Sequence, residues 1–222
     1  MKVLPQYDVI IVRSATQVRK ELIDACPNLK VIARGGVGMD NIDVDYARSK
    51  GIAVINTPAA STRSVAELAM SHIYALSRNI HRSKKDMSAA DADFKGLKSG
   101  YSKGTELAGK TLGIIGFGRI GQEVAKLAMG SNMRILPYDP YVEETELKFN
   151  IFGNDNLNLA VKVNTVDKEY VIKNSDFITL HLPFADGKPI IVAEEIAKMK
   201  NGVVFINTAR VGAINEDALM EG

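Results

Sequence analysis

The feature that most constrains the fold is a glycine-rich turn between an apolar strand and an amphipathic helix. Thr111–Ile115 is a short run rich in strand-forming apolar residues, and Gly116–Gly121 (GFGRIG) follows it without a gap. From Ile120 to Met129, apolar residues recur at helical spacing. A strand joined to a helix by so short a turn predicts a βα unit, which is the repeating element of a parallel sheet covered by helices.

The same alternation of strand and helix patterns extends along the rest of the chain. The predicted strands are Tyr7–Val12, Leu29–Ala33, Ile52–Asn56, Thr111–Ile115, Arg134–Tyr138, Asp176–Leu180 and Gly202–Asn207. The predicted helices are Val18–Cys26, Val44–Lys50, Ser61–Arg78, Ile120–Met129, Tyr170–Asn174 and Ala193–Met199. We therefore expect an α/β fold of two Rossmann-like lobes with parallel sheets, residues 1–58 and residues 59–222, with helices on the faces of each sheet.

Two stretches depart from this rhythm. Residues 86–105 are polar, contain glycine and have no clear period, so we expect a helix end followed by a surface loop. Within the less regular stretch Asn150–Val166, the alternation of Leu157–Val166 predicts a short hairpin inserted into the second lobe.

Composition excludes several classes of function. Hydrophobic residues make up 46% and charged residues 24% of the 222 residues, with a net charge of +2, so we expect neither nucleic acid nor a membrane as a partner. No stretch has the length of a signal peptide or of a membrane helix, which favours the cytoplasm. The single cysteine, Cys26, fits a reducing compartment. His72, His81 and His181 lack ligand spacing, so we expect no metal site.

The Gly116–Gly121 turn has the spacing of a dinucleotide-binding loop. In such loops the glycine at the position of Gly116 permits the tight turn, that at Gly118 lets a pyrophosphate approach the backbone, and that at Gly121 lets the helix pack against the strand. Asp139 lies 18 residues after Gly121, where a carboxylate would bind a ribose 2′-OH and repel a 2′-phosphate, which favours NAD over NADP. A glycine turn and an aspartate turn without a ligand are the alternative.

Arginines stand at the ends of two predicted strands in the first lobe. Arg13 and Arg34 each follow an apolar strand, so both side chains can project from the same edge of the sheet. Guanidinium groups bind phosphate well, which favours a phosphorylated substrate. Two solvent-exposed arginines at strand ends are the alternative interpretation.

Taken together, several motifs resemble one enzyme family. They are, in chain order, Asn56–Pro58 with Val65–Ala69, Gly116–Gly121 with Asp139, and Phe177–Pro183 with Asn207–Arg210. This combination resembles the D-isomer-specific 2-hydroxyacid dehydrogenases. Within that family Val12–Thr16, Arg34–Asp43 and Lys103–Leu107 are most similar to the D-3-phosphoglycerate dehydrogenases.

The resemblance implies a function. It implies NAD-dependent oxidation of D-3-phosphoglycerate to 3-phosphohydroxypyruvate, the first step toward serine, by hydride transfer from C2. The alternatives are another D-2-hydroxyacid dehydrogenase, of the glyoxylate, hydroxypyruvate or D-lactate type, or an NAD-sensing co-repressor of the same fold. A homodimer or higher homo-oligomer is expected, because the helix around Ser61–Arg78 commonly contributes to a dimer interface in this family.

The resemblance also implies site residues. Those expected to bind the cofactor are Gly116, Gly118, Arg119, Ile120, Gly121, Asp139, His181, Leu182, Pro183, Thr208, Ala209 and Arg210. Those expected to bind the substrate are Arg13, Ser14, Arg34, Gly36, Val37, Gly38 and Arg210. Arg210 would be catalytic, because the family's arginine at this position clamps the substrate carboxylate and orients the carbonyl group. Val211 departs from the glycine that usually follows this arginine.

Relative to the family, the chain is expected to be truncated at both ends. Members usually carry another strand and helix before the one at Tyr7–Val12, so residues 1–58 would be a partial, flavodoxin-like substrate lobe. Residues 59–222 would be a partial NAD-binding Rossmann domain. The family's proton-transferring histidine and its supporting glutamate would lie beyond Gly222.

Overall fold

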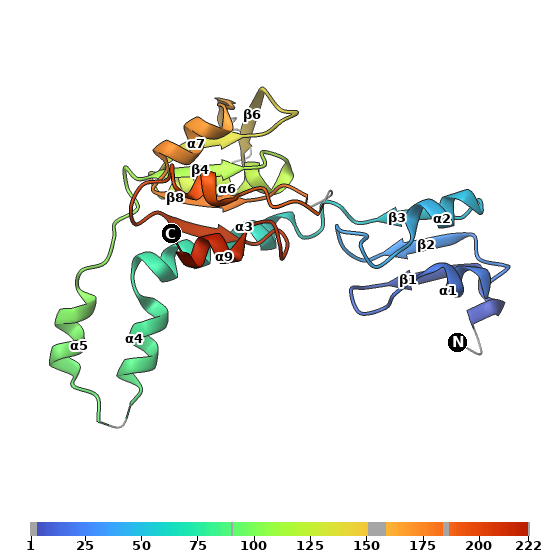
Figure 1. The fold of residues 1–222 in the computed structure, drawn as a ribbon, viewed down its shortest axis with the longest axis horizontal. Helices are drawn as coiled ribbons and strands as arrows, with labels where there is room; N and C mark the ends of the chain where they lie inside the picture. Colours follow the sequence, from blue (N-terminus) through green and yellow to red (C-terminus); the bar gives the residue numbers. More distant parts are fainter. Residues whose placement is uncertain (1–3, 90, 151–158, 184–186, 222) are drawn as a thin grey trace. The chain divides into compact units, whose positions relative to one another are not determined.

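The computed structural model describes residues 4–89, 91–150, 159–183 and 187–221. The chain divides into two compact units, Met1–Thr62 and Arg63–Gly222. Each unit has its own parallel sheet with helices packed against it, so the predicted α/β class is confirmed (Figure 1).

The first unit holds a three-stranded sheet of order β1-β2-β3. Its elements are the 3₁₀ helix η1 (Leu4–Gln6), β1 (Val9–Val12), α1 (Lys20–Asp24), β2 (Val31–Arg34), α2 (Val44–Ser49) and β3 (Ala53–Asn56). Helix α1 starts later than the pattern predicts, because Val18 instead forms an isolated β-bridge with Ile42. The carboxyl ends are in register, since Val12 pairs with Arg34 and Arg34 pairs with Asn56.

Helices cover only one face of this sheet in the described residues, which corrects the expectation of helices on both faces. Ile32 of β2 is fully buried against residues of α1 and α2. Ile11 of β1, which the apolar run predicts to be buried, is 76% exposed, and Val9 is also exposed. Because successive side chains of a strand point to opposite faces, an uninterrupted apolar run does not reveal which face is covered.

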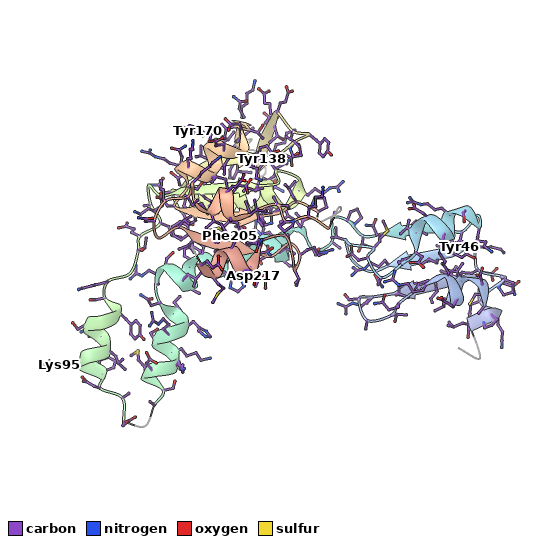
Figure 2. The ribbon with its side chains drawn as sticks, in the orientation of Figure 1. Tyr46, Lys95, Tyr138, Tyr170, Phe205 and Asp217 are labelled. Carbon is purple, nitrogen blue, oxygen red and sulfur yellow. The ribbon has the colours of Figure 1, made fainter. Side chains whose placement is uncertain are left out.

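The second unit holds a four-stranded parallel sheet of order β5-β4-β8-β9. The strands are β4 (Thr111–Ile115), β5 (Arg134–Tyr138), β8 (Phe177–Leu180) and β9 (Val204–Asn207). The helices of the same unit include α3 (Thr62–Ser77), α6 (Arg119–Gly130), α7 (Lys168–Asn174), α8 (Ala193–Ile196) and α9 (Glu216–Glu221). Figure 2 labels Tyr138 and Phe205, which lie on the two outer strands.

This second sheet is buried on both faces, as central parallel strands usually are. Leu112 and Ile114 of β4 pack with buried residues of α3 and α6. On the opposite face, Ile178 and Leu180 of β8 pack with buried residues of α7. The sheet is therefore a fixed platform, and the loops at its edges are positioned by strands that are buried on both sides.

The hairpin in the second unit is present but begins earlier than predicted. Strand β6 (Glu144–Phe149) pairs antiparallel with β7 (Leu159–Asn164), and Leu147 and Val163 of these strands are buried. The predicted range began at residue 157, and residues 157 and 158 lie outside the described part of the chain. The first strand was missed because its polar residues, such as Glu144 and Lys148, alternate with only a few apolar ones.

The prediction of a surface loop over residues 86–105 was wrong, because a second helix forms there. Helix α4 (Ile80–Met87) packs against α5 (Phe94–Tyr101), and the Tyr101 hydroxyl donates a hydrogen bond to Asp86. Neither helix has a buried residue, and α5 contains Gly96 and Gly100, which weaken the helical pattern. Among the described helices, none has both the length and the apolar character needed to cross a membrane.

Candidate functional site

The carboxyl ends of the four parallel strands in the second unit are level with one another. Ile115 pairs with both Tyr138 and Leu180, and Leu180 pairs with Asn207. The chain passes from β4 to β5 on one side and later crosses to β8 on the other side of β4. Open α/β sheets bind ligands where the strand order reverses in this way. The loops after β4 and β8 therefore flank a natural binding site.

Backbone hydrogen bonds hold the loop after β4 in place. The Gly116 N–H donates to the Tyr138 carbonyl at 2.8 Å, and the His181 N–H donates to the Ile115 carbonyl at 2.8 Å. The Phe117 N–H donates to Oδ2 of Asp139 at 2.7 Å. The loop after β4 is thus hydrogen-bonded to residues at the ends of both neighbouring strands, β5 and β8.

The fold itself requires two of the three glycines in this loop. Gly116 has a φ of +100°, and a Cβ there would lie 2.6 Å from the backbone of His181 and Leu182. A Cβ on Gly121 would lie 2.1 Å from the Gly116 carbonyl oxygen. These contacts involve backbone atoms that cannot move aside cheaply, so both positions need glycine for the turn and for packing of α6.

Gly118 differs from the other two glycines. It has a φ of −72°, which any residue adopts, and a Cβ there would meet no atom within 4 Å. Gly118 is exposed at the N-cap of α6, whose unpaired N–H groups and helix dipole favour an anion. An open space in front of a 12-residue helix fits a phosphate group that lies directly against the backbone.

The carboxylate of Asp139 is fixed in position by the backbone around it. Oδ2 accepts the Phe117 N–H at 2.7 Å, and Oδ1 accepts the Tyr141 N–H at 2.9 Å. Each oxygen keeps lone-pair capacity for a hydroxyl donor. Of the other predicted residues on this loop, Arg119 is exposed and Ile120 is half-buried at the start of α6.

The loop after β8 begins with a histidine that stays neutral. His181 is half-buried and hydrogen-bonded through Nε2 to the buried Thr179 hydroxyl at 3.0 Å. Burial lowers the pKa of His181 to about 4. At neutral pH the ring is therefore uncharged and a weak base. Leu182 is half-buried and Pro183 is exposed beside it.

The loop after β9 carries Arg210 on a turn held by Asn207. Oδ1 of Asn207 accepts the Ala209 N–H at 3.0 Å, and Nδ2 donates to the Arg210 carbonyl at 2.9 Å. The buried Thr208 hydroxyl has no hydrogen-bond partner among the described residues, which fits a polar ligand nearby. Asn207 was not among the predicted site residues, although an asparagine at a strand end often organises the following turn.

Arg210 also borders a cavity of 690 Å³ beside β9 and α9. Its apolar wall includes Phe205, Ile214 and Leu219, and its polar lining residues are Asn207, Thr208, Arg210 and Glu216. No residue of the Gly116–Gly121 loop is among those that line this cavity.

In the first unit, the predicted substrate residues gather at the carboxyl edge of the sheet. Nη2 of Arg34 donates to the Ser14 hydroxyl at 3.3 Å, and Cγ of Arg13 lies 3.7 Å from where a Cβ on Gly35 would be. We call Arg13, Ser14 and Arg34 the arginine cluster. Gly36 gives Arg34 its room, since a Cβ there would lie 1.4 Å from Nη1.

The remaining predicted residues of the first unit form the loop beside the cluster. Val37 is exposed and Gly38 is half-buried. The side chain of Asn56, at the end of β3, donates to the Val37 carbonyl at 2.7 Å and so anchors this loop. The sequence motifs did not assign a role to Asn56, or to the buried Asn41, whose side chain contacts Arg34 of the arginine cluster.

Metal-ligand clusters are absent from the described residues: no group of three His, Cys, Asp or Glu could hold a metal ion there. His72 on α3 and His81 on α4 are both exposed. Among the described residues, the site thus offers an open helix N-terminus near a fixed carboxylate in one unit, and arginines in both.

Comparison with known proteins identifies relatives of this chain. Residues 70–222 match the family model described as D-isomer specific 2-hydroxyacid dehydrogenase, NAD binding domain. Over 222 residues the chain is 49% identical to a hydroxypyruvate reductase of Thermotoga maritima, which covers all of this chain and 66% of that protein. Over 215 residues it is 43% identical to a D-3-phosphoglycerate dehydrogenase of Methanocaldococcus jannaschii, with 96% of this chain and 38% of that protein covered.

A solved structure agrees with these relatives. The NAD⁺-bound 3-phosphoglycerate dehydrogenase of Entamoeba histolytica matches with a TM-score of 0.73 and 31% identity, over 99% of this chain and 61% of that one. The chain thus spans about two thirds of the first relative's length and well under half of the second's.

Proposed function

Because the chain belongs to the D-isomer specific 2-hydroxyacid dehydrogenase family, we propose that its second unit binds NAD for hydride transfer at C2 of a 2-hydroxy acid. The observation that carries the proposal is Gly118, a glycine that the protein's own packing does not require, at the open N-terminus of α6. A pyrophosphate lying against the backbone there explains why a side chain is absent.

The loops at the carboxyl edge of the second sheet would each bind a different part of NAD. The loop Gly116–Gly121 holds the pyrophosphate through N–H groups, with Arg119 beside it, and Asp139 accepts hydrogen bonds from the ribose hydroxyls. His181–Pro183 and Thr208–Arg210 line the remainder of the cofactor site. NAD supplies the hydride acceptor. A carboxylate at Asp139 disfavours the 2′-phosphate of NADP.

For the substrate, we propose D-3-phosphoglycerate, oxidised to 3-phosphohydroxypyruvate. Arg210 would hold the carboxylate and keep C2 oriented, since a guanidinium pairs with a carboxylate through two hydrogen bonds. The first unit would be the substrate lobe, with Arg13, Ser14 and Arg34 holding the phosphate and the loop of Gly36, Val37 and Gly38 beside it. A guanidinium has only donors, so Arg210 would orient the substrate and would not take the hydroxyl proton.

The second candidate is reduction of hydroxypyruvate, which carries no phosphate. The relative that is 49% identical over the whole of this chain is a hydroxypyruvate reductase, and this observation favours the alternative. The arginine cluster favours the phosphorylated acid, because it puts two cationic residues at neighbouring strand ends, where an anion would be stabilised.

The deciding experiment compares the two substrates in the full-length protein. We expect NADH formation with D-3-phosphoglycerate, NAD preferred to NADP, and kcat/KM for phosphoglycerate lowered by tenfold or more in Arg34→Met. Arg48→Met, on the exposed side of α2, is the matched control and should change nothing. Activity with hydroxypyruvate that is unaffected by Arg34→Met, together with none on phosphoglycerate, would favour the alternative.

We also propose that the protein is a cytoplasmic homodimer. Helix α3 leaves Leu68, Tyr74 and Leu76 between 42% and 54% exposed, which is apolar surface suited to a second copy. Light scattering on the full-length protein tests this: Leu68→Glu with Leu76→Glu should give a monomer if α3 forms the contact.

A further inference from the structure

One buried side chain connects the separate parts of the arginine cluster. Asn41 is 6% exposed, and its Nδ2 donates to the Arg13 carbonyl at 2.9 Å and to the Thr16 carbonyl at 2.7 Å. Its Oδ1 accepts from Nε of Arg34 at 3.4 Å. Both N–H donors and the oxygen of one amide are thus hydrogen-bonded. The amide thereby connects the loop after β1 with Arg34 at the end of β2.

These bonds determine where the two arginines lie. Two short hydrogen bonds from the buried Asn41 hold the loop from Arg13 to Thr16, so the backbone that carries Arg13 and Ser14 is held in place. The longer bond to Nε limits rotation of the Arg34 guanidinium, whose Nη2 then reaches Ser14. A single amide therefore holds the backbone of Arg13–Thr16 and orients the guanidinium of Arg34.

The charge around the cluster leaves it suited to an anion. Within the described residues, Arg34 donates only to neutral groups: the Asn41 amide, the Gly35 carbonyl and the Ser14 hydroxyl. The nearby acid Asp43 is paired instead with Arg19 at 2.9 Å. Arg34 has no acidic partner in these hydrogen bonds, and Arg13 follows Val12, which pairs with Arg34 on the neighbouring strand. Two cationic residues at adjacent strand ends form a site that a doubly charged anion would stabilise.

We propose that Asn41 is the positioning residue that makes Arg13, Ser14 and Arg34 a single site for the substrate phosphate group. Asn41 is buried and does not touch the phosphate itself; it acts by fixing the loop and the guanidinium that do. The proposal rests on the proposed function, since it names the residue that makes the phosphorylated acid the preferred substrate. It predicts that Asn41 affects phosphorylated substrates and leaves the chemistry at C2 alone.

The test uses the full-length protein and a pair of substrates that differ only in the phosphate. Asn41→Ala should raise KM for D-3-phosphoglycerate about tenfold, the effect of losing one charge-assisted hydrogen bond. With D-glycerate, which lacks the phosphate, kcat/KM should stay within about twofold. Asn28→Ala is the matched control, because Asn28 also donates to a backbone carbonyl, that of Pro5 at 3.1 Å, away from the cluster.

A structural role alone would lower both activities together, in parallel with the melting temperature, and that result would overturn the proposal. If Asn41→Ala does not fold, Asn41→Ser keeps a donor for one carbonyl and should show a smaller rise in KM with the same selectivity. An equal loss on both substrates in Asn41→Ser would equally overturn it.

Failure of the proposed function gives a different result. If the unmutated protein oxidises neither acid, calorimetry with inorganic phosphate still tests the site. Binding that is weakened in Asn41→Ser and lost in Arg34→Met, but kept in Asn28→Ala, supports the positioning role without the dehydrogenase activity. Phosphate bound equally by all of these variants, or by none, refutes the role of Asn41.

Discussion

At the scale of single residues, the three glycines after β4 have different physical reasons to be glycine. A Cβ on Gly121 would lie 2.1 Å from the Gly116 carbonyl oxygen, whereas a Cβ on Gly118 would meet nothing. The absence of a side chain at Gly121 is thus needed for folding, whereas at Gly118, in our proposal, it is needed for the cofactor to bind.

Alanine at these two positions should separate stability from cofactor binding. Gly121→Ala should lower the free energy of unfolding by about 1–3 kcal/mol, because it overpacks the contact between helix and strand. Gly118→Ala should leave stability within about 0.5 kcal/mol yet weaken NAD binding by tenfold or more. Denaturant melts and NADH fluorescence titrations give both quantities. NAD affinity unchanged in Gly118→Ala would contradict the cofactor site.

His181 should make stability depend on pH. Burial lowers its pKa from 6.5 to about 4, so between these values the unfolded chain binds the proton that the folded chain does not. Above pH 6.5 this histidine does not reduce the free energy of unfolding. As the pH falls from 6.5, protonation of the unfolded chain lowers the free energy of unfolding, by about 2 kcal/mol at pH 5. Lowered carboxylate pKa values act below this range, since they contribute only near and below pH 4.5.

The matched comparison is between two histidines of the second unit. His181→Asn should flatten the free energy of unfolding between pH 6.5 and pH 5, measured by urea melts at constant ionic strength. His81→Asn, at an exposed position on α4, should leave the slope as it is. A slope that survives His181→Asn would show that another group titrates there.

At the scale of elements, the short helix α8 depends on a side chain from α7. Nζ of Lys168 donates to the Ile190 carbonyl at 2.6 Å and to Glu195 at 2.9 Å, and Glu195 also accepts the Val192 N–H at 3.0 Å. Burial raises the pKa of Glu195, but the hydrogen bonds from Lys168 and from the backbone outweigh it, so its pKa lies below the usual value. A four-residue helix is not stable without such contacts.

Removing this lysine should therefore cost more than removing another lysine of the same helix. Lys168→Met should destabilise the protein by about 1–3 kcal/mol, since it leaves the Ile190 carbonyl without this donor and the half-buried Glu195 carboxylate without its cation. Lys173→Met, which loses an exposed ion pair with Glu169, should stay within about 0.5 kcal/mol. Thermal and urea unfolding distinguish the two, and equal effects would show that the Lys168 contacts add no stability.

At the scale of the whole molecule, the two units should respond to different ligands. We expect NAD to slow hydrogen exchange in residues 116–121 and 139–141, and inorganic phosphate to slow it in residues 13–16 and 34–41. The reason is that the helix N-terminus and Asp139 belong to the second unit, whereas the arginine cluster belongs to the first. Exchange mass spectrometry on the full-length protein measures both, and NAD protection confined to Met1–Thr62 would refute this division.

Much of the architecture could be predicted because it depends on neighbouring residues. Each predicted parallel strand is present with bounds that shift by at most two residues, and the β4–glycine loop–α6 unit was predicted with its strand bounds unchanged. Apolar periodicity and glycine positions are local properties, so they can be recognised without the folded chain. Helix α5 could not be, because Gly96 and Gly100 interrupt the pattern and its packing against α4 stabilises it.

The amino-acid sequence by itself determined the α/β class, the two parallel sheets and the glycine loop that opens α6. Only the tertiary structure decided that Gly118 lies in open space while Gly121 does not, that His181 is neutral, and that Asn41 holds Arg13 and Arg34 together. The physical reason is distance along the chain. Asn41 is 28 residues from the carbonyl it binds, and contacts at that separation exist only after the sheet has brought its strand ends together.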